Sequence, residues 1–471
     1  MPARPPGRVA CCRHGGAVDN AGMAHARGLA SINVILRLPI ARGRLALRLK
    51  PVPMTAWRLV VAGMLALAIA MGIGRFAFTP LLPIMLADGV TSLAAASWLA
   101  SANYFGYLLG ALFCAFQPWL WRRAGSVSPV NGPALVRGGL AATVLLTLSM
   151  ALPVPTAWPA LRFAAGVASA LVFVYSSGWC LAQLAQLRLP AMGALIFVGP
   201  GAGIVLSGLA ASAMVALHWP AAAGWLIFGV LAAMLTAMAW PVFDSRMGGA
   251  GTAAAAAPMT ATSSAMTPRR TAGVAEIALL AVAYGLAGFG YIITATFLPV
   301  IARQALPASP WLDMFWPIFG IGVIAGALLA SRVRPSRDMR PLLAGCYLMQ
   351  ATGIAASVIY PSLAGFALGS VLLGIPFTAI TFFALNEVRR LRPAQTASLM
   401  GLLTALYGLG QIAGPPLAAV LAAHSGEPAA GFSLSLKIAA IALVAGALMY
   451  VAMAKAFPHE QETAARLASR Q

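Results

Sequence analysis

The segment GIGRFAFTPLLP at residues 72–83 has a close copy later in the chain, GFGYIITATFLP at residues 288–299. Both begin with G-x-G and end in Leu-Pro, and equivalent residues, such as Gly72 and Gly288, are 216 positions apart. One register that persists over two segments and the loop between them indicates a parallel internal repeat, so the chain is expected to form two related halves. In the next apolar stretch, Gly106, Gly110, Ala111 and Leu112 fall on Gly322, Gly326, Ala327 and Leu328.

The composition of the chain is that of an integral membrane protein. Of its 471 residues, 61% are hydrophobic and 9% are charged, whereas soluble proteins have about 45–50% apolar and about 25% charged residues. Lipid must cover part of so much apolar surface. A net charge of +21 would suggest nucleic acid in a soluble protein, but here the arginines lie in short tracts between apolar runs, as in membrane loops. We therefore expect a lipid bilayer around the chain and no nucleic-acid partner.

Twelve apolar runs are long enough to cross a bilayer, whose core of about 30 Å needs about 20 residues of helix. The sequence therefore predicts an all-α membrane protein with twelve transmembrane helices, six in each half. The runs cover residues 58–86, 91–117, 138–154, 157–186, 190–217, 220–242, 273–303, 311–333, 340–360, 362–388, 394–423 and 432–457.

The segments outside these runs suggest how the chain is organised. Residues 243–271 are rich in Gly, Ala, Ser and Thr, which predicts a flexible linker. Residues 1–53 are basic and contain no spanning run, so they are either a disordered tail or codons upstream of a true start at Met54. The expected order is a tail at 1–53, a six-helix bundle at 54–242, the linker at 243–271, a second six-helix bundle at 272–457 and a tail at 458–471.

Arginines in the loops predict the orientation of the helices, because basic residues concentrate in cytoplasmic loops. The loops on one side carry fourteen arginines, and the opposite loops carry only Arg303. Both termini and the linker are therefore expected to be cytoplasmic. The excess of arginine over lysine, with abundant Ala and Gly, is typical of a GC-rich bacterial genome and predicts the cytoplasmic (inner) membrane. The fourteen are Arg122, Arg123, Arg137, Arg188, Arg246, Arg269, Arg270, Arg332, Arg334, Arg337, Arg340, Arg389, Arg390 and Arg392.

Several short motifs resemble those of a known transporter family. They are the block at 71–83, N-Y-x-G-Y-x-x-G at 103–110, R-x-x-x-G at 162–166, G-P-G-x-G at 199–203 and G-x-G-Q-x-x-G-P at 408–415. Together they resemble the major facilitator superfamily, and within it the YbfB/YjiJ family. The resemblance implies two pseudo-symmetric six-helix bundles that work by alternating access, with the substrate site between the halves near the midplane. The loop at 117–125 departs from the superfamily pattern, because it has basic residues but no acid.

Two arginines inside apolar runs are candidates for binding a solute. Arg75 lies deep in the first run and Arg162 lies in the fourth, and an arginine in mid-membrane costs about 2.5–3.5 kcal/mol even on insertion scales. A guanidinium can bind a carboxylate or phosphate through two parallel hydrogen bonds; the structural alternative for each is a hydrogen bond to a neighbouring helix. Tyr291 occupies the position of Arg75 in the second half. The other candidates for binding are Tyr104, Tyr175, Tyr291, Tyr407 and Gln411.

Proline and glycine inside the runs predict hinges, because proline removes a backbone hydrogen bond and glycine lets helices touch. The candidate hinge residues are Pro83, Gly199, Pro200, Gly201, Pro299, Gly414 and Pro415.

Acidic residues are scarce, and none lies at the centre of a run. Proton-driven transport usually needs a buried carboxylate whose protonation changes with the state of the protein. Asp313 and Glu387 are the candidates for this role, and for each the alternative is an ordinary charge at the end of a helix.

The sequence favours neither a cofactor nor a metal nor catalysis. Its five cysteines form no C-x-x-C pair and its histidines do not stand at metal-ligand spacing. A G-x-x-x-x-G-K-[ST] phosphate loop is missing, which argues against an ATP-driven pump, and no catalytic constellation lies within the runs, which argues against an enzyme.

The leading hypothesis is a monomeric secondary active transporter that moves a small organic solute across the membrane. An anion is one class of solute and the proton is one candidate coupling ion. A transport-inactive sensor or scaffold built on a transporter fold is the alternative from a different class.

The predicted orientation can be tested with reporter fusions. Reporters fused after residues 89 and 250 should lie on opposite sides of the membrane, because the first position follows one span and the second follows six. Reporters on the same side would overturn the predicted topology.

Overall fold

The computed structural model describes residues 54–123, 131–243, 273–333, 338–392 and 396–458. The predicted tail at 1–53 lies outside the described residues, as do almost all of the predicted linker at 243–271 and of the C-terminal tail at 458–471. Helices make up the described chain, and twelve of the helical segments are long and apolar enough to cross a membrane. The protein is thus an all-α membrane protein, as predicted.

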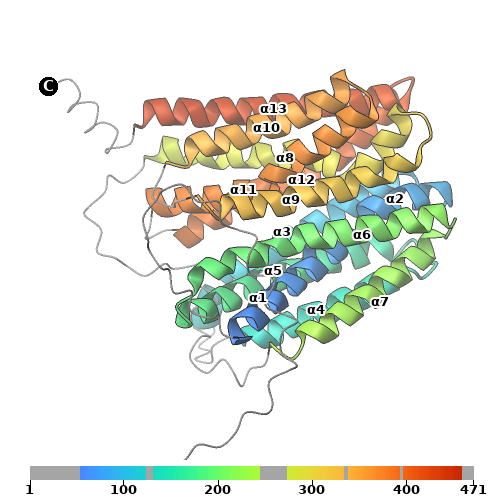
Figure 1. The fold of residues 1–471 in the computed structure, drawn as a ribbon. Helices are drawn as coiled ribbons and strands as arrows, with labels where there is room; N and C mark the ends of the chain where they lie inside the picture. Colours follow the sequence, from blue (N-terminus) through green and yellow to red (C-terminus); the bar gives the residue numbers. More distant parts are fainter. Residues whose placement is uncertain (1–53, 124–130, 244–272, 334–337, 393–395, 459–471) are drawn as a thin grey trace, which may run out of the picture. The chain divides into compact units, whose positions relative to one another are not determined.

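The helices follow the predicted runs closely (Figure 1). The first half contains α1 (Met54–Leu67), the π-helix η2 (Ala68–Arg75), α2 (Phe78–Ala87), α3 (Leu93–Arg123), α4 (Gly132–Ser149), α5 (Trp158–Gln186), the 3₁₀-helix η3 (Pro190–Val198), α6 (Gly199–Ala216) and α7 (Ala221–Ala239). The second half contains α8 (Val274–Ala305), the 3₁₀-helix η5 (Pro310–Met314), α9 (Phe315–Ala330), α10 (Arg340–Ile359), α11 (Leu363–Leu391), α12 (Thr396–His424) and α13 (Pro428–Ala456).

The third span lies several residues earlier than the predicted 138–154. Its helix, α4, begins at Gly132 because the Asn131 side chain accepts a hydrogen bond from the backbone N–H of Ala134 at 3.1 Å, which caps the helix. Arg137, which the sequence analysis placed in a loop, therefore lies inside α4, one turn from its start. The capping residue decides this boundary, and a count of apolar residues does not detect it.

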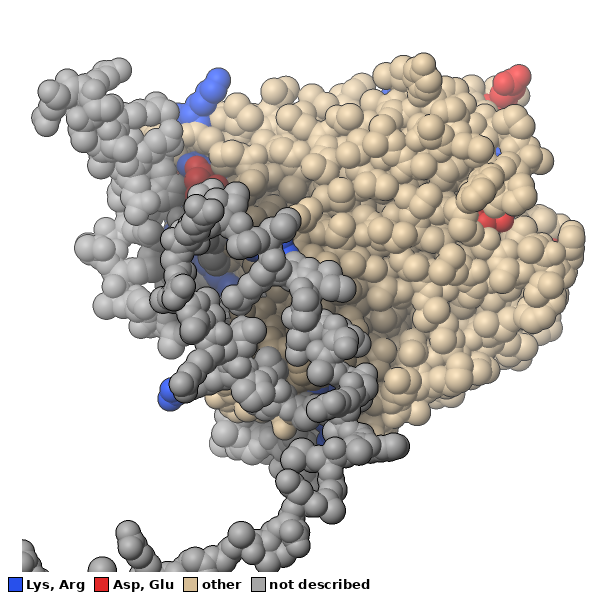
Figure 2. Space-filling view, viewed as in Figure 1, with Lys and Arg blue, Asp and Glu red and all other residues tan. Residues whose placement is uncertain are grey.

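A broad and largely uncharged belt lies on the surface of the described part of the chain. Figure 2 shows most charged side chains of one face near two opposite edges, with mainly uncharged residues between them. Large apolar side chains project from this surface, among them Leu145, Met238 and Ile441, each at least 64% exposed. Such a belt is the surface that a bilayer covers.

Glycines allow the helices to pack backbone against backbone. A Cβ atom on Gly326 of α9 would lie 1.8 Å from the carbonyl oxygen of Ile375 in α11, and one on Gly106 of α3 would lie 2.0 Å from that of Phe163 in α5. Any larger residue would force these helix pairs apart. Close packing of this kind stabilises helix pairs in lipid, where no hydrophobic effect drives association.

The first span is not a continuous α-helix. The backbone N–H of Phe76 bonds the carbonyl of Met71, five residues earlier, at 3.1 Å, as in a π-helix. Because Pro80 has no N–H, it cannot bond the carbonyl of Phe76, and the N–H of Thr79 bonds that carbonyl at 3.1 Å. The carbonyl of Arg75, which Thr79 would bond in a regular helix, is left for another donor. Turns of π-helix occur often at functional sites.

The contact at Gly326 predicts a large difference between two matched substitutions. Gly326→Ala should lower stability by roughly 1–3 kcal/mol or prevent folding, because the new methyl group meets backbone. Gly345→Ala, in α10, should leave stability unchanged or raise it slightly, because a Cβ there has no neighbour within 4 Å. Melting temperatures of the two variants in detergent test this, and equal temperatures would contradict it.

Candidate functional site

A chain of hydrogen bonds joins the two halves of the molecule around Arg75. Nη2 of Arg75, at the end of η2, donates to Oε1 of Gln411 in α12 at 2.8 Å. Nε2 of the same Gln411 donates to the hydroxyl oxygen of Tyr291 in α8. The two residues that the repeat places in equivalent positions, Arg75 and Tyr291, are thus both bonded to one glutamine.

This arrangement breaks the symmetry of the repeat. The dipeptide Gly199-Pro200 of the first half corresponds to Gly414-Pro415 of the second. With this alignment, the residue of the first half that corresponds to Gln411 is Ile196. The first half therefore carries the charge of Arg75 where the second has Tyr291. The second half carries the amide of Gln411 where the first has Ile196. A ligand between the halves meets one fixed positive charge and one neutral hydrogen-bonding side.

Aromatic rings surround the guanidinium of Arg75. Its Cζ lies 4.0 Å from the ring centroid of Tyr107, 5.1 Å from that of Tyr104 and 5.3 Å from that of Phe76. These distances fall within the range of cation–π attraction, which is worth about 2 kcal/mol or more when the pair is desolvated. Arg75, Gln411, Tyr291, Tyr104 and Tyr107 are called the Arg75 cluster below.

Other aromatic residues extend the cluster within the second half. The ring of Tyr291 stacks on that of Tyr407 at 5.8 Å and meets the edge of Phe377 at 5.2 Å. Tyr284 lies 4.9 Å from Tyr407 on the other side, and its hydroxyl donates to Oγ1 of Thr381 at 3.2 Å. The site is therefore lined by rings with hydroxyl groups at their ends.

Arg75 is buried and has no carboxylate partner in the described part of the chain. It is 3% exposed, and Gln411 and Tyr291 are 2% exposed. The ion pairs among the described residues all involve Arg303, Arg340 or Arg390 instead. The Nε of Arg75 has no hydrogen-bond partner there. A buried charge without a counter-charge is costly, so the cluster is suited to an anion from outside the protein.

Three further hydrogen bonds join the halves to one side of the cluster. Oγ1 of Thr79 donates to the carbonyl of Ala295 at 2.8 Å, and these two residues are repeat equivalents, 216 positions apart. The hydroxyls of Tyr104 and Thr296 lie 2.9 Å apart, and Oγ of Ser101 donates to the carbonyl of Ile412 at 2.8 Å. The halves therefore meet tightly between the cluster and the side that the arginine pattern predicts to be extracellular.

Contacts on the other side of the cluster also join the halves: η3 packs on α9, and a Cβ on Gly408 of α12 would lie 3.1 Å from Leu108 of α3. The segment α1, which leads to Arg75 from the predicted cytoplasmic side, packs on α5, α6, α7 and η3 of its own half, whereas α2 packs on α8. Residues of α12 before Gln411, from Leu399 to Tyr407, are mostly half-buried.

Arg162 lies near the cluster but points at the backbone of helix 1. Its Nη1 donates to the carbonyl of Gly74 at 3.2 Å and its Nη2 to the carbonyl of Arg75 at 3.0 Å. It is 2% exposed, and its Cζ lies 4.9 Å from the ring of Phe78. Arg162 thus bonds the carbonyl of Arg75, which has no helical donor because the first span is broken there.

The remaining candidates for binding fall into two groups. Tyr104 and Tyr407 lie in or beside the Arg75 cluster. The hydroxyl of Tyr175 donates to Oε1 of Gln117 at 3.4 Å, and both residues belong to the first half. Tyr175 therefore has a partner of its own, and none of its described contacts is with the cluster.

Both candidates for proton coupling have arginine partners. Asp313 pairs with Arg303. Glu387 is fully buried, pairs with Arg390 and lies 3.6 Å from Nε of Arg340. Oε2 of Glu387 also accepts from the backbone N–H of Met339 at 3.2 Å. Each carboxylate is thus paired with an arginine, and a role in proton coupling stays a prediction.

The charged group around Arg340 joins the ends of several helices. The guanidinium is fully buried and lies 3.2 Å from Glu276 of α8 and 2.8 Å from Asp338, just before α10. Burial alone would raise the pKa of the Asp338 carboxyl, but the hydrogen bonds and the charge of Arg340 lower that pKa below its usual value. The group stabilises one end of the second half.

The candidate hinge residues occupy varied positions. Gly199 stands where η3 changes to α6, and Pro200 and Gly201 lie in the first turn of α6. Pro83 lies inside α2, Pro299 inside α8 and Pro415 inside α12. Two of the glycines mark close approaches: a Cβ on Gly199 would lie 2.2 Å from the carbonyl of Met64, and one on Gly414 would lie 2.4 Å from Ile292.

Sequence reasoning missed several residues of the site. Among the aromatic rings, that of Tyr107 lies nearest to the guanidinium of Arg75, and its position three residues after Tyr104 could have indicated it, because residues i and i+3 share a helix face. Phe76, Phe377 and Thr296 have no signal in the sequence beyond their presence in apolar runs. Their role depends on how the helices pack.

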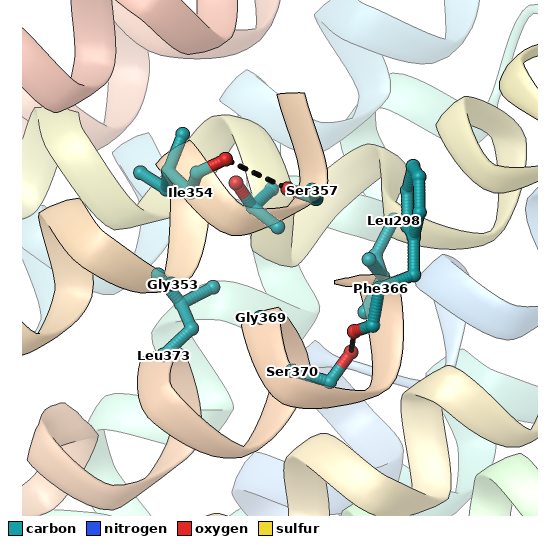
Figure 3. A pocket seen from close by; sticks show the side chains of 9 residues that line it. Leu298, Gly353, Ile354, Ser357, Phe366, Gly369, Ser370 and Leu373 are labelled. Carbon is teal, nitrogen blue, oxygen red and sulfur yellow. Dashed lines mark hydrogen bonds between the residues drawn. The ribbon is translucent and has the colours of Figure 1, made fainter. Parts of the chain in front are cut away.

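A small cavity lies within the second half between α8, α10 and α11 (Figure 3). Its volume is about 10 Å³, which leaves room for one water at most. The hydroxyls of Ser357 and Ser370, which line it, donate to the carbonyls of Ile354 and Phe366 (Figure 3). Thr294, also in the lining, has a hydroxyl without a partner among the described residues. An organic solute does not fit there, so the Arg75 cluster remains the candidate site.

The described residues hold no group of three or more His, Cys, Asp or Glu that could bind a metal ion.

No curated protein matches the chain. Among solved structures, a mutant of the nucleoside transporter NupG is similar in fold, with a TM-score of 0.64 and 14% sequence identity, over 85% of this chain and 99% of that one. The profile of the family described as "Uncharacterised MFS-type transporter YbfB" matches residues 67–451. The chain therefore belongs to the YbfB-type family of major facilitator superfamily transporters.

Proposed function

We propose that this transporter is a secondary active carrier of a small organic anion, which binds at the Arg75 cluster and crosses the membrane by alternating access. The observation that supports the proposal is the buried guanidinium of Arg75 at the contact between the halves. Its hydrogen-bond acceptor there is a neutral amide, and no carboxylate of the described residues pairs with it.

We expect the anion to take the place of the carbonyl oxygen of Gln411. This oxygen accepts from Nη2 of Arg75, and a carboxylate or phosphate oxygen in that place would make a charge-assisted bond, which is roughly twice as strong as a neutral one. A solute that displaces the amide would also leave the hydroxyl of Tyr291 available as a second hydrogen-bonding group. In this proposal Gln411 bonds Arg75 and Tyr291 until the solute takes its place.

The rings around the guanidinium favour a particular kind of solute. The aromatic rings of Tyr104, Tyr107, Tyr291, Tyr407 and Phe377 form apolar walls, and the hydroxyls at the ends of the tyrosine rings are hydrogen-bonding groups. Sites of this type bury an apolar ligand body and orient it through a few polar contacts. We expect an anionic head and an apolar or hydroxylated body.

The contacts between the halves support a carrier with two states. In the state described, Thr79 and Ser101 bond the halves together on the predicted extracellular side of the cluster, and in this proposal solute enters from the cytoplasmic side. The opposite state needs these bonds to break and the predicted cytoplasmic ends to approach each other. The orientation, the location in a bacterial inner membrane and a monomeric carrier are part of this proposal.

The proton is the coupling ion that we consider in this proposal. Glu387 and Asp313 remain the acids considered for proton coupling, but each is paired with an arginine and none of the described contacts links them to the Arg75 cluster. A proton that is carried with the solute, on its own acid group, would need neither residue.

Two substitutions of Arg75 test the anion site. Arg75→Ala should weaken the binding of a transported anion by roughly thirtyfold or more, because it leaves a buried charge without its partner. Arg75→Lys keeps the charge but loses the planar fork, so it should weaken binding less. The measurement is uptake into proteoliposomes from a panel of small carboxylates and phosphate esters, with melting temperature in detergent as the control for folding. A stable Arg75→Ala protein with normal affinity for its anion would end the proposal.

Arg162 should behave differently from Arg75. Arg162→Ala leaves two buried carbonyls without their donor, which costs roughly 1–3 kcal/mol each, so the melting temperature should fall. Arg58→Ala is the matched control, because Arg58 is exposed on α1 and its loss should change little. A stable Arg162→Ala protein that has lost anion affinity would instead make Arg162 a binding residue.

A further inference from the structure

A groove on the membrane-facing surface of the first half lies between α4 and α7. Its volume is about 550 Å³, and seven of its eight lining residues are apolar. Because bilayer surrounds this surface, the groove is open to lipid chains. The lining residues are Ala141, Val144, Leu145, Ala233, Thr236, Ala237, Trp240 and Pro241.

A positive charge stands at one end of this groove. Arg137 lies on α4 one turn before Ala141, and its Nε and Nη2 donate to the carbonyl of Trp240, at 3.2 and 3.0 Å. Its Cζ lies 5.2 Å from the ring of Trp240. The Nη1 group makes no hydrogen bond to a described residue, and the side chain is only half-buried. Arg137 can therefore still donate to an anion.

A hydroxyl group lines the groove one turn further from this end. Thr236 is 7% exposed, and its Oγ1 has no hydrogen-bond partner in the described part of the chain. A threonine in a helix usually donates to a carbonyl of its own helix, so this hydroxyl is free to bond a polar group of a ligand in the groove. Thr236 lies next to the level of Ala141, because α4 and α7 run in opposite directions and Arg137 meets Trp240.

The groove is thus graded from polar to apolar. Arg137 and Trp240 form the first level, at the side predicted to be cytoplasmic, and Thr236 with Ala141 forms the second. The levels beyond them contain only aliphatic side chains: Val144, Leu145 and Ala233. A phospholipid has the same order of groups, with a phosphate, then ester oxygens, then hydrocarbon.

Comparison with the second half shows what Arg137 lacks. There, Arg340 of α10 bonds the carbonyls of Met453 and Phe457 at the end of α13, at 3.1 and 2.8 Å, much as Arg137 of α4 bonds the end of α7. Acidic residues surround Arg340, with Glu276 and Asp338 within 3.2 Å. Arg137 has no acidic partner among the described residues. An anion from the bilayer would supply the missing charge.

We propose that the groove between α4 and α7 binds one anionic phospholipid, with its phosphate at Arg137, an ester oxygen at Thr236 and an acyl chain along α4 and α7. Basic pockets between transmembrane helices on the cytoplasmic side are known to bind anionic headgroups. The proposal does not depend on the solute that the Arg75 cluster carries, because no residue is shared between the two sites.

Native mass spectrometry of the full chain tests the proposal. Protein reconstituted with equal amounts of phosphatidylglycerol and phosphatidylcholine should retain one phosphatidylglycerol, preferred about fivefold, since one arginine near the surface contributes that much. Arg137→Gln should abolish the preference and Arg137→Lys should keep most of it. Ala141→Phe should reduce retention of both lipids, because it fills the groove without changing the charge. Arg58→Ala, an exposed arginine on α1, should change nothing.

Several outcomes would overturn the proposal. These are equal retention of the two lipids by the unaltered chain, an unchanged preference in Arg137→Gln, or inorganic phosphate that competes as well as the lipid does. Asp244, four residues after Trp240, lies outside the described residues. If phosphatidylglycerol binds only after Asp244→Asn, then that acid already neutralises Arg137 and the lipid does not. Melting temperatures of all variants in detergent identify any loss caused by misfolding.

Discussion

One buried positive charge accounts for much of the arrangement between the two halves. A guanidinium in mid-membrane costs about 2.5–3.5 kcal/mol even by insertion scales, and no carboxylate of the described residues pairs with Arg75. The rings of Tyr107 and Tyr104, each worth about 2 kcal/mol or more when desolvated, and the amide of Gln411 offset this cost together. Because Gln411 belongs to the other half, its share of this stabilisation is present only while the halves touch.

The break in the first transmembrane span, at η2 and Pro80, determines the position of Arg75. A regular helix would direct the carbonyl of Arg75 along its own axis, whereas the π-turn and Pro80 leave that carbonyl to Arg162. The backbone at Arg75 is thus held from the first half, while its side chain reaches the second. Fixed backbone and shared side chain are what a carrier needs if a solute is to change how the halves meet.

Much of the fold could be predicted from the sequence, and less of the site. The twelve runs and the 216-residue repeat are local or periodic signals, so the helices lie close to their predicted ranges, with the third span displaced because Asn131 caps it. The repeat also paired Arg75 with Tyr291, and the structure brings both to Gln411. Arg162, Glu387 and Asp313 could not be assigned in this way, since only three-dimensional packing shows that carbonyls or opposite charges already occupy them. The π-turn depends on which carbonyl each amide reaches, and composition does not record that.

Most of the bonds between segments described above end on a backbone carbonyl. Thr79 bonds that of Ala295, Ser101 that of Ile412, and Arg162 those of Gly74 and Arg75. A carbonyl is present whatever side chain the position bears, so only the donor must be kept when sequences drift. Among Arg75, Gln411 and Tyr291 every partner is a side chain, and a change in one requires a change in another. If the Arg75 cluster binds the solute, relatives with different solutes should therefore differ together at these three positions, while the positions whose carbonyls accept from Thr79 and Ser101 vary freely.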